Sequence, residues 1–381
     1  MTAYLRLQLV MVALSGVLAV GLWLLTGRLP LLRRRTLARC VVIGPLGFLA
    51  SAAATPAATS LLHRGFSGFA TVALVFHALW FWLPLCLLVR WWRARAQAGA
   101  QRGAAAGWAL VGLPAFLTGL WAMFVEPDRL VVHSDRIEVA GWGAEDPPLR
   151  IVHISDLQTV GECARERAAL ELIAELEPDL VVFTGDLVAG PLPDDGEGVA
   201  AARAFVAGLR ARLGVVIVDG HCESEATRDE VLAGLDVIVP RNEAVLFDLE
   251  GGRRLRLVGF RADRADLRLA TAPPAAGEVI LVASHIPDVT LHLPPHVALH
   301  LAGHTHGGQI VVPGFGAPIT LSRLPRETAR GTSRRGLFPL HVSAGIGMEG
   351  GFAPRIRMFC PPEVCLLELV GSDAPVAEVL R

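Results

Sequence analysis

The sequence predicts an α/β domain that follows a membrane region of about four helices. The mean hydropathy of the 381-residue chain is +0.48, which is too high for an ordinary soluble domain. The apolar excess lies in the first third of the chain, whereas short runs rich in Val and Ile alternate with helical patterns after Glu126. We therefore divide the chain into a transmembrane region (1–127) and a globular part.

Four charge-free stretches make up the predicted membrane region: 7–25, 40–62, 65–89 and 103–125. Each is close to the roughly 20 residues with which an α-helix crosses a bilayer. The second stretch, which contains "SAAATPAATS", is the least hydrophobic of them. Only Arg6 precedes the first stretch, whereas a cleaved signal peptide carries its positive charge there, so we interpret this stretch as a retained helix.

Arginines in the predicted loops indicate the orientation in the membrane. The loops after the first and third stretches are strongly basic, while the loop after the second contains only His63 and Arg64. Short basic loops stay on the cytoplasmic side, so the residues after Val125 are predicted to lie outside the cytoplasmic membrane. If the second stretch did not insert, this orientation would reverse. The basic residues are Arg28, Arg33, Arg34, Arg35 and Arg39 in the first loop, and Arg90, Arg93, Arg95 and Arg102 in the other.

Charge and cysteine content narrow the function classes. The net charge is −1 and the globular part has no basic patch, which argues against nucleic-acid binding. An extracytoplasmic location permits disulfides, but the four cysteines after residue 127 allow three pairings and the sequence does not choose among them. The chain has no Cys-x-x-Cys pair of the kind that binds zinc.

The globular part reads as a series of buried strands and helices between residues 149 and 372. Helical spacing of apolar residues predicts helices within 163–178 and 196–214. The later strands follow one another closely, which predicts a second sheet packed on the first. Residues 128–148 are interpreted as a linker and 373–381 as a tail. The strands are predicted within 149–155, 180–185, 214–220, 254–260, 278–285, 297–303, 337–345 and 363–370. His153 and His300 alternate with apolar residues inside strands and are expected in the core.

Acidic residues and histidines follow five of these strands at the point where each strand ends. In open α/β sheets the carboxyl ends of the strands meet at the binding crevice. Carboxylate and imidazole ligands suit Mn, Fe and Zn, and two ions about 3.5–4 Å apart can clamp a phosphate and activate a water. The sequence therefore predicts a centre with two divalent metal ions. Its candidate ligands are Asp156, Asp186, His221, His285, His304 and His306.

The ordered pattern Asp156 … "GD" … "H" … "GHTHGGQ" resembles the calcineurin-like metallophosphoesterase superfamily, and in particular its membrane-anchored bacterial branch. The segments "RNEAVLFDLEGGRRLRLVGF" and "RIRMFCPPEVCLLELV" are also similar to that branch, so the resemblance covers about residues 149–370. It implies a β-sandwich flanked by helices and hydrolysis by a metal-bound hydroxide. It also implies that Asp156, Asp186 and His306 hold the first ion, and that Asp186, His285 and His304 hold the second.

Two motifs depart from the family pattern. The first motif is normally Asp-x-His, but here it reads "DLQ", with Gln158 in place of the second ligand. The third is normally Gly-Asn-His followed by an acid, but here it is "GHCE". Without a gap, His221 takes the position of the metal-binding Asn and Cys222 that of the catalytic His. With a shift of one residue, His221 becomes the catalytic histidine and the Asn ligand is missing.

The predicted function is hydrolysis of a phosphate mono- or diester, with a phospholipid or cell-envelope component as the favoured substrate. A different class of function is a degenerate, non-catalytic metal-binding membrane module that senses or docks. The losses at Gln158 and in "GHCE" support that alternative. A transporter is less well supported, because no charged residue within the stretches marks a pathway.

Overall fold

The computed structural model describes residues 13, 15, 16, 73, 76–94, 100–190, 196–334, 338–350 and 353–372. These residues belong to two compact units. The helical unit comprises Met1–Val125 and Gly350–Arg355, and the α/β unit comprises Glu126–Glu349 and Ile356–Arg381. The predicted membrane stretches 7–25 and 40–62, most of the first half of 65–89 and the tail 373–381 lie outside the described residues.

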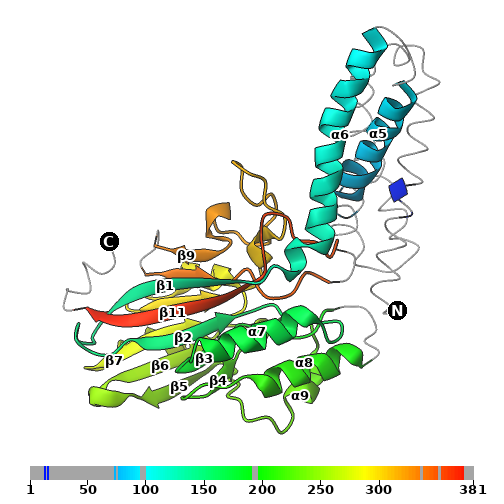
Figure 1. Cartoon of the computed structure of the whole chain (residues 1–381). Coiled ribbons are helices and arrows are strands. Elements are labelled where there is room, and N and C mark those ends of the chain that lie inside the picture. Colours follow the sequence, from blue (N-terminus) through cyan, green and yellow to red (C-terminus); the bar gives the residue numbers. More distant parts are fainter. Residues whose placement is uncertain are drawn as a thin grey trace. The chain divides into compact units, whose positions relative to one another are not determined.

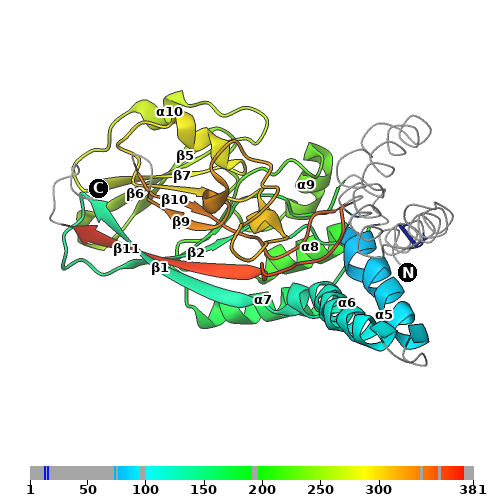
Figure 2. The ribbon, with the colours of Figure 1, turned by 90° about the horizontal axis from the view of Figure 1, so that it is seen from above.

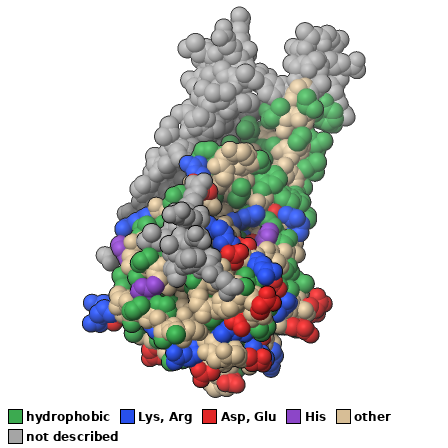
Figure 3. Space-filling model, turned by 90° about the vertical axis from the view of Figure 1, so that its left-hand side faces the viewer, with side chains coloured by type: hydrophobic (Ala, Val, Ile, Leu, Met, Phe, Trp, Pro, Cys, Tyr) green, Lys and Arg blue, Asp and Glu red, His purple; other side chains and the backbone are tan. Residues whose placement is uncertain are grey.

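The described part of the helical unit contains two packed α-helices. The π-helical turn η1 (Ala78–Trp82) leads into α5 (Leu83–Ala94), which packs along α6 (Ala100–Phe124). Within the described residues, one helical segment, Ala109–Asp128, is long and apolar enough to cross a bilayer, so a region of four spans is not shown. Figure 3 shows hydrophobic side chains along this unit. Those exposed on α6 include Leu110, Val111, Leu113, Leu117 and Phe124.

The α/β unit is built on two mixed sheets, whose strands run side by side in Figure 1. In the first sheet the order is β1 (Val131–Ala140), β11 (Glu363–Ser372), β2 (Leu149–Ile154), β3 (Leu180–Phe183) and β4 (Val215–Ile217). In the second it is β5 (Glu243–Asp248), β6 (Arg254–Gly259), β7 (Glu278–Ala283), β8 (Leu299–Ala302), β10 (Leu340–Val342) and β9 (Gly331–Ser333). Strands β2–β4 are mutually parallel, and so are β6, β7, β8 and β10.

Side-chain alternation along the strands produces layers. Ile151 points into the apolar core between the two sheets, while its neighbour Val152 points to the opposite face. That face is covered by α7 (Ala164–Glu175), α8 (Glu197–Gly208) and α9 (Glu225–Leu232). The outer face of the second sheet is covered by the short helix α10 (Arg268–Thr271) and the 3-10 helix η4 (Pro287–His292), so helices flank both sheets (Figure 2).

The segment 128–148, interpreted as a linker, instead contains strand β1. This strand pairs in parallel with β11 from Val131↔Glu363 to Ala140↔Ser372, and Ile137 and Val139 are buried in the core. The partner strand lies at the far end of the sequence, so the local pattern carries no sign of the pairing. The chain therefore enters the α/β unit at η2 (Glu126–Asp128), directly after α6 and Val125.

The remaining described elements are short. They are the 3-10 turns η3 (Glu250–Gly252), η5 (His306–Gly308) and η6 (Arg326–Thr328). The two strand histidines expected in the core are fully buried. His153 hydrogen-bonds His341 at 2.8 Å between their Nδ1 atoms, and His300 Nε2 lies 2.8 Å from the hydroxyl of Ser284.

Candidate metal centre

All the predicted ligand residues lie in loops that follow the carboxyl ends of β2, β3, β4, β7 and β8. These strands belong to two sheets packed face to face, so the five loops meet at one edge of the sandwich. The structure brings together three overlapping groups of ligand atoms, each within 4.8 Å of one another: His221, His285 and His304; Asp186, His221 and Cys222; and Asp156, Asp186 and His285.

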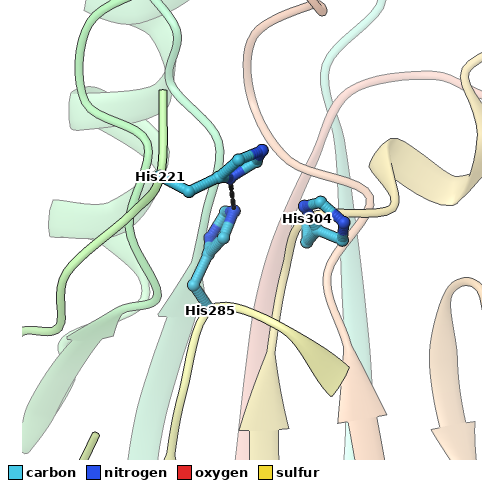
Figure 4. Close-up of side chains that lie close together, drawn as sticks. All are labelled: His221, His285 and His304. Carbon is cyan, nitrogen blue, oxygen red and sulfur yellow. Dashed lines mark hydrogen bonds between the residues drawn. The ribbon is translucent and has the colours of Figure 1, made fainter. Parts of the chain in front are cut away.

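Three imidazoles from three loops point toward one another (Figure 4). The Nδ1 atom of His221 lies 2.9 Å from Nε2 of His285. The ring of His304 lies beside both, with centroids 4.7 Å from His221 and 5.2 Å from His285. The structure thus brings His221 beside the two other predicted histidine ligands.

Hydrogen bonds to backbone carbonyls orient two of these rings. Nδ1 of His285 lies 2.7 Å from the carbonyl of Thr184, which leaves Nε2 to face the centre. Nε2 of His304 lies 3.2 Å from the carbonyl of Leu321. The buried Nδ1 of His304 has no hydrogen-bond partner among the described residues. A histidine whose one nitrogen is held by a carbonyl presents the lone pair of the other, which is the usual arrangement at metal sites.

The carboxylate of Asp186 contacts both the backbone of the loop after β4 and two of the imidazoles. Its Oδ1 accepts the backbone N–H groups of His221 at 2.7 Å and Cys222 at 3.0 Å. Its Oδ2 lies 3.4 Å from Nδ1 of His221 and 3.3 Å from Nε2 of His285. Burial alone would raise the pKa of Asp186, but the charge on His285 and the hydrogen bonds from both histidines hold it well below its usual range. The carboxylate is therefore ionised and faces the imidazoles.

The same coupling changes the protonation of the histidines. Burial opposes protonation of His285, yet the charge and hydrogen bond of Asp186 raise its pKa to about 10. Burial and the neighbouring His285 and His221 lower the pKa of His304 to about 4. In the protein alone, one proton is thus held between Asp186 and His285. Metal ions bind at such sites in place of protons.

Asp156 and His306 form the other side of the centre. Both oxygens of Asp156 accept the backbone N–H of His304, at 3.2 and 3.0 Å, and Oδ1 lies 3.4 Å from Nε2 of His306. Burial raises the pKa of Asp156 to about 6. Burial also lowers the pKa of His306 well below its ordinary value, so this imidazole is neutral.

The backbone at the centre is held in conformations that side chains rarely adopt. Asp156, Asp186, His304 and His306 have φ between 50° and 70°, and Gln158 has φ 37°. Such strain persists where the surroundings over-determine it, and it clusters at functional sites. Close packing contributes: a Cβ on Gly220 would lie 2.1 Å from the backbone nitrogen of Asp186. The glycine of "DGHC" thus allows the loop after β4 to approach the loop after β3.

The two residues that depart from the family pattern face each other. The amide nitrogen of Gln158 lies 3.3 Å from Sγ of Cys222, 3.0 Å from Oδ2 of Asp186 and 3.1 Å from Nε2 of His306. Burial and the charges of Asp186 and Glu349 raise the pKa of the Cys222 thiol. In the absence of a metal ion this thiol therefore stays protonated, which makes it a poor proton donor to a leaving alkoxide.

Sequence reasoning did not single out Glu349, Leu321 or Arg357. Oε2 of Glu349 lies 3.7 Å from Nε2 of His306, and Leu321 orients His304. Arg357 is fully buried and donates to the carbonyls of the loop 344–347, which in turn hydrogen-bonds the backbone next to Asp156. Arg357 lies in the segment "RIRMFC". The sequence of this segment resembles the membrane-anchored branch of the family, but it does not indicate a function for the arginine.

The donor set fits a divalent cation. Ligand nitrogens of three imidazoles lie within 4.8 Å of one another, a carboxylate oxygen of Asp186 lies 3.4 and 3.3 Å from two of these rings, and Nδ1 of His304 is buried without a hydrogen bond among the described residues. Imidazole-rich sites with carboxylates suit Zn, Fe and Mn. The described cysteines are free, and Cys222 is therefore not engaged in a disulfide within this part of the chain.

Comparison with known proteins agrees with this geometry. The profile for calcineurin-like phosphoesterases matches residues 149–308. The metallophosphoesterase YkuE of Bacillus subtilis is 28% identical over 236 residues, covering 58% of this chain and 77% of that protein. A metallophosphoesterase of Aquifex aeolicus is 30% identical over 245 residues, covering 59% and 86%. The UDP-2,3-diacylglucosamine pyrophosphatase LpxG of Chlamydia trachomatis is 28% identical over 316 residues, covering 66% and 92%.

Proteins of this family use a centre of two divalent metal ions, and the cluster of histidines and aspartates provides the ligands for such a centre. The matched residues 149–308 begin at β2 and include every loop that contributes to the cluster. With its two mixed sheets, its convergent imidazoles and these relatives, the chain belongs to the calcineurin-like phosphoesterase family, whose members are hydrolases acting on phosphate ester bonds.

Proposed function

We propose that this protein is a membrane-anchored metallophosphoesterase that hydrolyses a phosphate ester of a lipid or cell-envelope component outside the cytoplasmic membrane. The observation that carries the catalytic part is the cluster of His221, His285 and His304, two of which, His221 and His285, also contact the carboxylate of Asp186. When bound, two divalent ions at such a centre supply activation of a water and neutralisation of phosphate charge.

We assign Asp186 as the residue shared by both ions. Its Oδ1 is held by two backbone N–H groups, so Oδ2 is directed into the centre. The second site then consists of Asp186 with the three histidines. The first consists of Asp156, Asp186 and His306, with Gln158 beside them. The second site has three imidazole ligands, so we expect it to bind a metal ion before the first site does.

The membrane attachment is supported by α6 and by the way it joins the α/β unit. α6 ends at Phe124, and η2 begins at Glu126 with its carboxylate fully buried and paired with Arg129 at 2.8 Å. A helix that crosses a bilayer would therefore hold the α/β unit within a few residues of the surface, since no linker intervenes. Substrates embedded in that surface would be favoured over free solutes.

The orientation is tested by fusing alkaline phosphatase after residue 127 and, separately, after residue 98. The reporter folds only outside the cytoplasmic membrane. We expect activity from the first fusion and none from the second, because the loop before residue 103 is rich in arginine. The opposite pattern would place the catalytic unit in the cytoplasm and exclude an envelope substrate.

An apolar loop lies beside the candidate centre. After the strained turn at His306, the segment 310–326 exposes large hydrophobic side chains, and Leu321 is 49% exposed although its carbonyl receives the hydrogen bond of His304. Leu321 has φ 55°, which is rare for leucine and turns its carbonyl toward the centre. The guanidinium of Arg326 lies 4.1 Å from the ring of Phe315. The exposed set is Val312, Phe315, Ile319 and Leu321. We name this set the apolar rim.

The apolar rim favours an amphiphilic substrate. Exposed apolar side chains next to a polar site suit a ligand that has hydrocarbon chains attached to a phosphate. Arg326, whose guanidinium lies over the ring of Phe315, would remain in contact with water or lipid head groups while its stem covers apolar surface. The name of the chlamydial relative refers to a diacylated sugar, which is also an amphiphile.

The substrate class is tested by replacing Leu321 with aspartate in the full-length protein. Burying a leucine side chain contributes about 1.5–3 kcal/mol, so Leu321→Asp is expected to lower hydrolysis of phosphate-ester lipids in mixed vesicles by about tenfold or more. Hydrolysis of a soluble aryl phosphodiester should change little. The vesicles contain phosphatidic acid as a monoester and phosphatidylglycerol as a diester, and released phosphate or glycerol is measured with Mn²⁺, Fe²⁺ or Zn²⁺ present.

Leu246→Asp is the matched control, because Leu246 on β5 is 58% exposed and outside the rim. It should leave both activities unchanged. Equal losses on lipid and aryl substrates in Leu321→Asp would show that the rim acts only through His304. Absence of hydrolysis with any substrate and metal would contradict the proposed function and favour a binding module.

A further inference from the structure

The two departures from the family pattern occur at residues that contact each other. Gln158 lies in the loop after β2 and Cys222 in the loop after β4, yet the amide nitrogen of one is 3.3 Å from the sulfur of the other. Their contact suggests that one replacement accommodates the other.

Three groups with lone pairs surround the amide nitrogen of Gln158. They are Oδ2 of Asp186 at 3.0 Å, Nε2 of His306 at 3.1 Å and Sγ of Cys222 at 3.3 Å. An amide nitrogen has only two hydrogens, so it can donate to no more than two of these three atoms. A carboxylate, an imidazole and a sulfur that converge on one point form a set of ligands for a cation. The amide nitrogen marks the position of that cation.

Asp156 completes this set. Its Oδ1 lies 3.4 Å from Nε2 of His306, and the sulfur of Cys222 belongs to a group with Asp186 and His221 whose ligand atoms lie within 4.8 Å of one another. The sulfur is therefore close to the shared carboxylate, and it lies 3.3 Å from the same amide nitrogen that His306 contacts. Gln158 and Asp186 are fully buried, so the geometry is not that of a flexible surface.

We propose that the thiolate of Cys222 is a ligand of the first metal ion and replaces the imidazole that Gln158 lacks. Asp156, Asp186, His306 and Cys222 then form the first site, and Gln158 turns its amide aside to hydrogen-bond the ligands. On binding, the S–H bond breaks, the sulfur keeps the electron pair and bonds the metal, and the proton passes to solvent. This inference rests on the proposed metal-dependent function.

A sulfur ligand changes the preference for metals. Thiolate favours Zn²⁺, Fe²⁺ and Co²⁺ over the harder Mn²⁺ and Mg²⁺. Replacing Cys222 by serine should weaken Zn²⁺ at the first site by about 100-fold or more, because even partners outside the ligand shell contribute about 10–100-fold to affinity. Affinity for Mn²⁺ should change much less. The second site, made of Asp186 and three histidines, should be affected little.

The test is Co²⁺ titration of the full-length, metal-free protein in detergent, followed by absorption. A Cys222 ligand produces thiolate-to-cobalt charge-transfer absorption in the near ultraviolet, whereas the histidine site contributes only weak visible bands. We expect the ultraviolet band to appear with the second equivalent of Co²⁺ and to be lost in Cys222→Ser. It should be unchanged in Cys86→Ser, because Cys86 lies on α5 in the helical unit.

X-ray absorption of the zinc-loaded wild-type protein provides a measurement that needs no variant. A sulfur scatterer at about 2.3 Å from zinc supports the assignment. Two bound ions with no sulfur scatterer, or an ultraviolet band that persists in Cys222→Ser, would overturn it while leaving the metal-dependent function intact. Failure of the wild-type protein to bind any divalent ion would overturn both.

Discussion

Asp186→Asn is expected to lower the hydrolytic rate by about 1000-fold or more, equivalent to about 4 kcal/mol of transition-state stabilisation. Asp186 is fully buried and contacts residues from three loops of the candidate centre. One oxygen accepts two backbone N–H groups, and the other faces His221, His285 and Gln158. In asparagine, one of these positions becomes an NH₂ group. Either the backbone N–H groups of His221 and Cys222 lose their acceptor, or an NH₂ group faces the proposed metal ions. The negative charge is lost in both orientations.

The measurement is the rate constant for an aryl phosphodiester at saturating metal, together with metal content of the purified protein. We expect fewer than two ions per chain in Asp186→Asn. Asp219→Asn is a suitable control, because Asp219 is also buried but pairs with Arg228 at 2.9 Å. It should lower stability and retain both ions. Two bound ions and near-normal turnover in Asp186→Asn would exclude Asp186 as the shared ligand.

Arg357→Met is expected to lower the free energy of unfolding of the α/β unit by about 4 kcal/mol or more. The side chain is fully buried, and its guanidinium donates to the carbonyls of Ala344, Gly345, Gly347 and Cys360 at 2.6–3.1 Å. Methionine fills a similar volume but leaves these carbonyls without hydrogen-bond donors. Each buried carbonyl without a donor lowers the free energy of unfolding by about 1–3 kcal/mol. The loop 344–347 also hydrogen-bonds Ser155 and Asp156, so activity should fall with stability.

Urea unfolding of the full-length protein, followed by tryptophan fluorescence, measures this loss. Arg357→Lys keeps the charge but not the five donors of the guanidinium, so its loss should be intermediate or close to that of methionine. Arg150→Met is the control, because Arg150 is 38% exposed and its pair with Glu368 is worth about 0–1 kcal/mol. A change of less than about 1 kcal/mol in Arg357→Met would show that water replaces the missing donors.

Several features of the α/β unit could be predicted from local sequence. Apolar runs such as 149–155 and 278–285 correspond to β2 and β7, because alternation and turn residues are local properties. Asp156, Asp186, His285, His304 and His306 could be singled out, since ligand residues that directly follow strands must lie at the same edge of a sheet. The motif "GHTHGGQ" carried the resemblance to the family. It is also local, because a tight turn with two histidines needs glycines next to it.

Other features depended on pairing between distant residues, which the sequence does not express locally. Strand β1 pairs with β11 at the opposite end of the chain, so residues 128–148 showed no sign of belonging to a sheet. Gln158 and Cys222 each read as a lost functional group until the fold placed one beside the other. The same holds for Leu321, whose carbonyl orients His304 from a loop with no motif.

The sequence by itself determined which chemical groups lie at the candidate centre: carboxylates and imidazoles in the family's order, with an amide and a thiol at positions that depart from it. Only the tertiary structure decided which of their atoms face one another. Ligand identity is a property of single residues at strand ends. Ligand geometry depends on how two sheets pack, on the left-handed backbone at Asp156, Asp186 and His304, and on the carbonyls that select one nitrogen of His285 and one of His304.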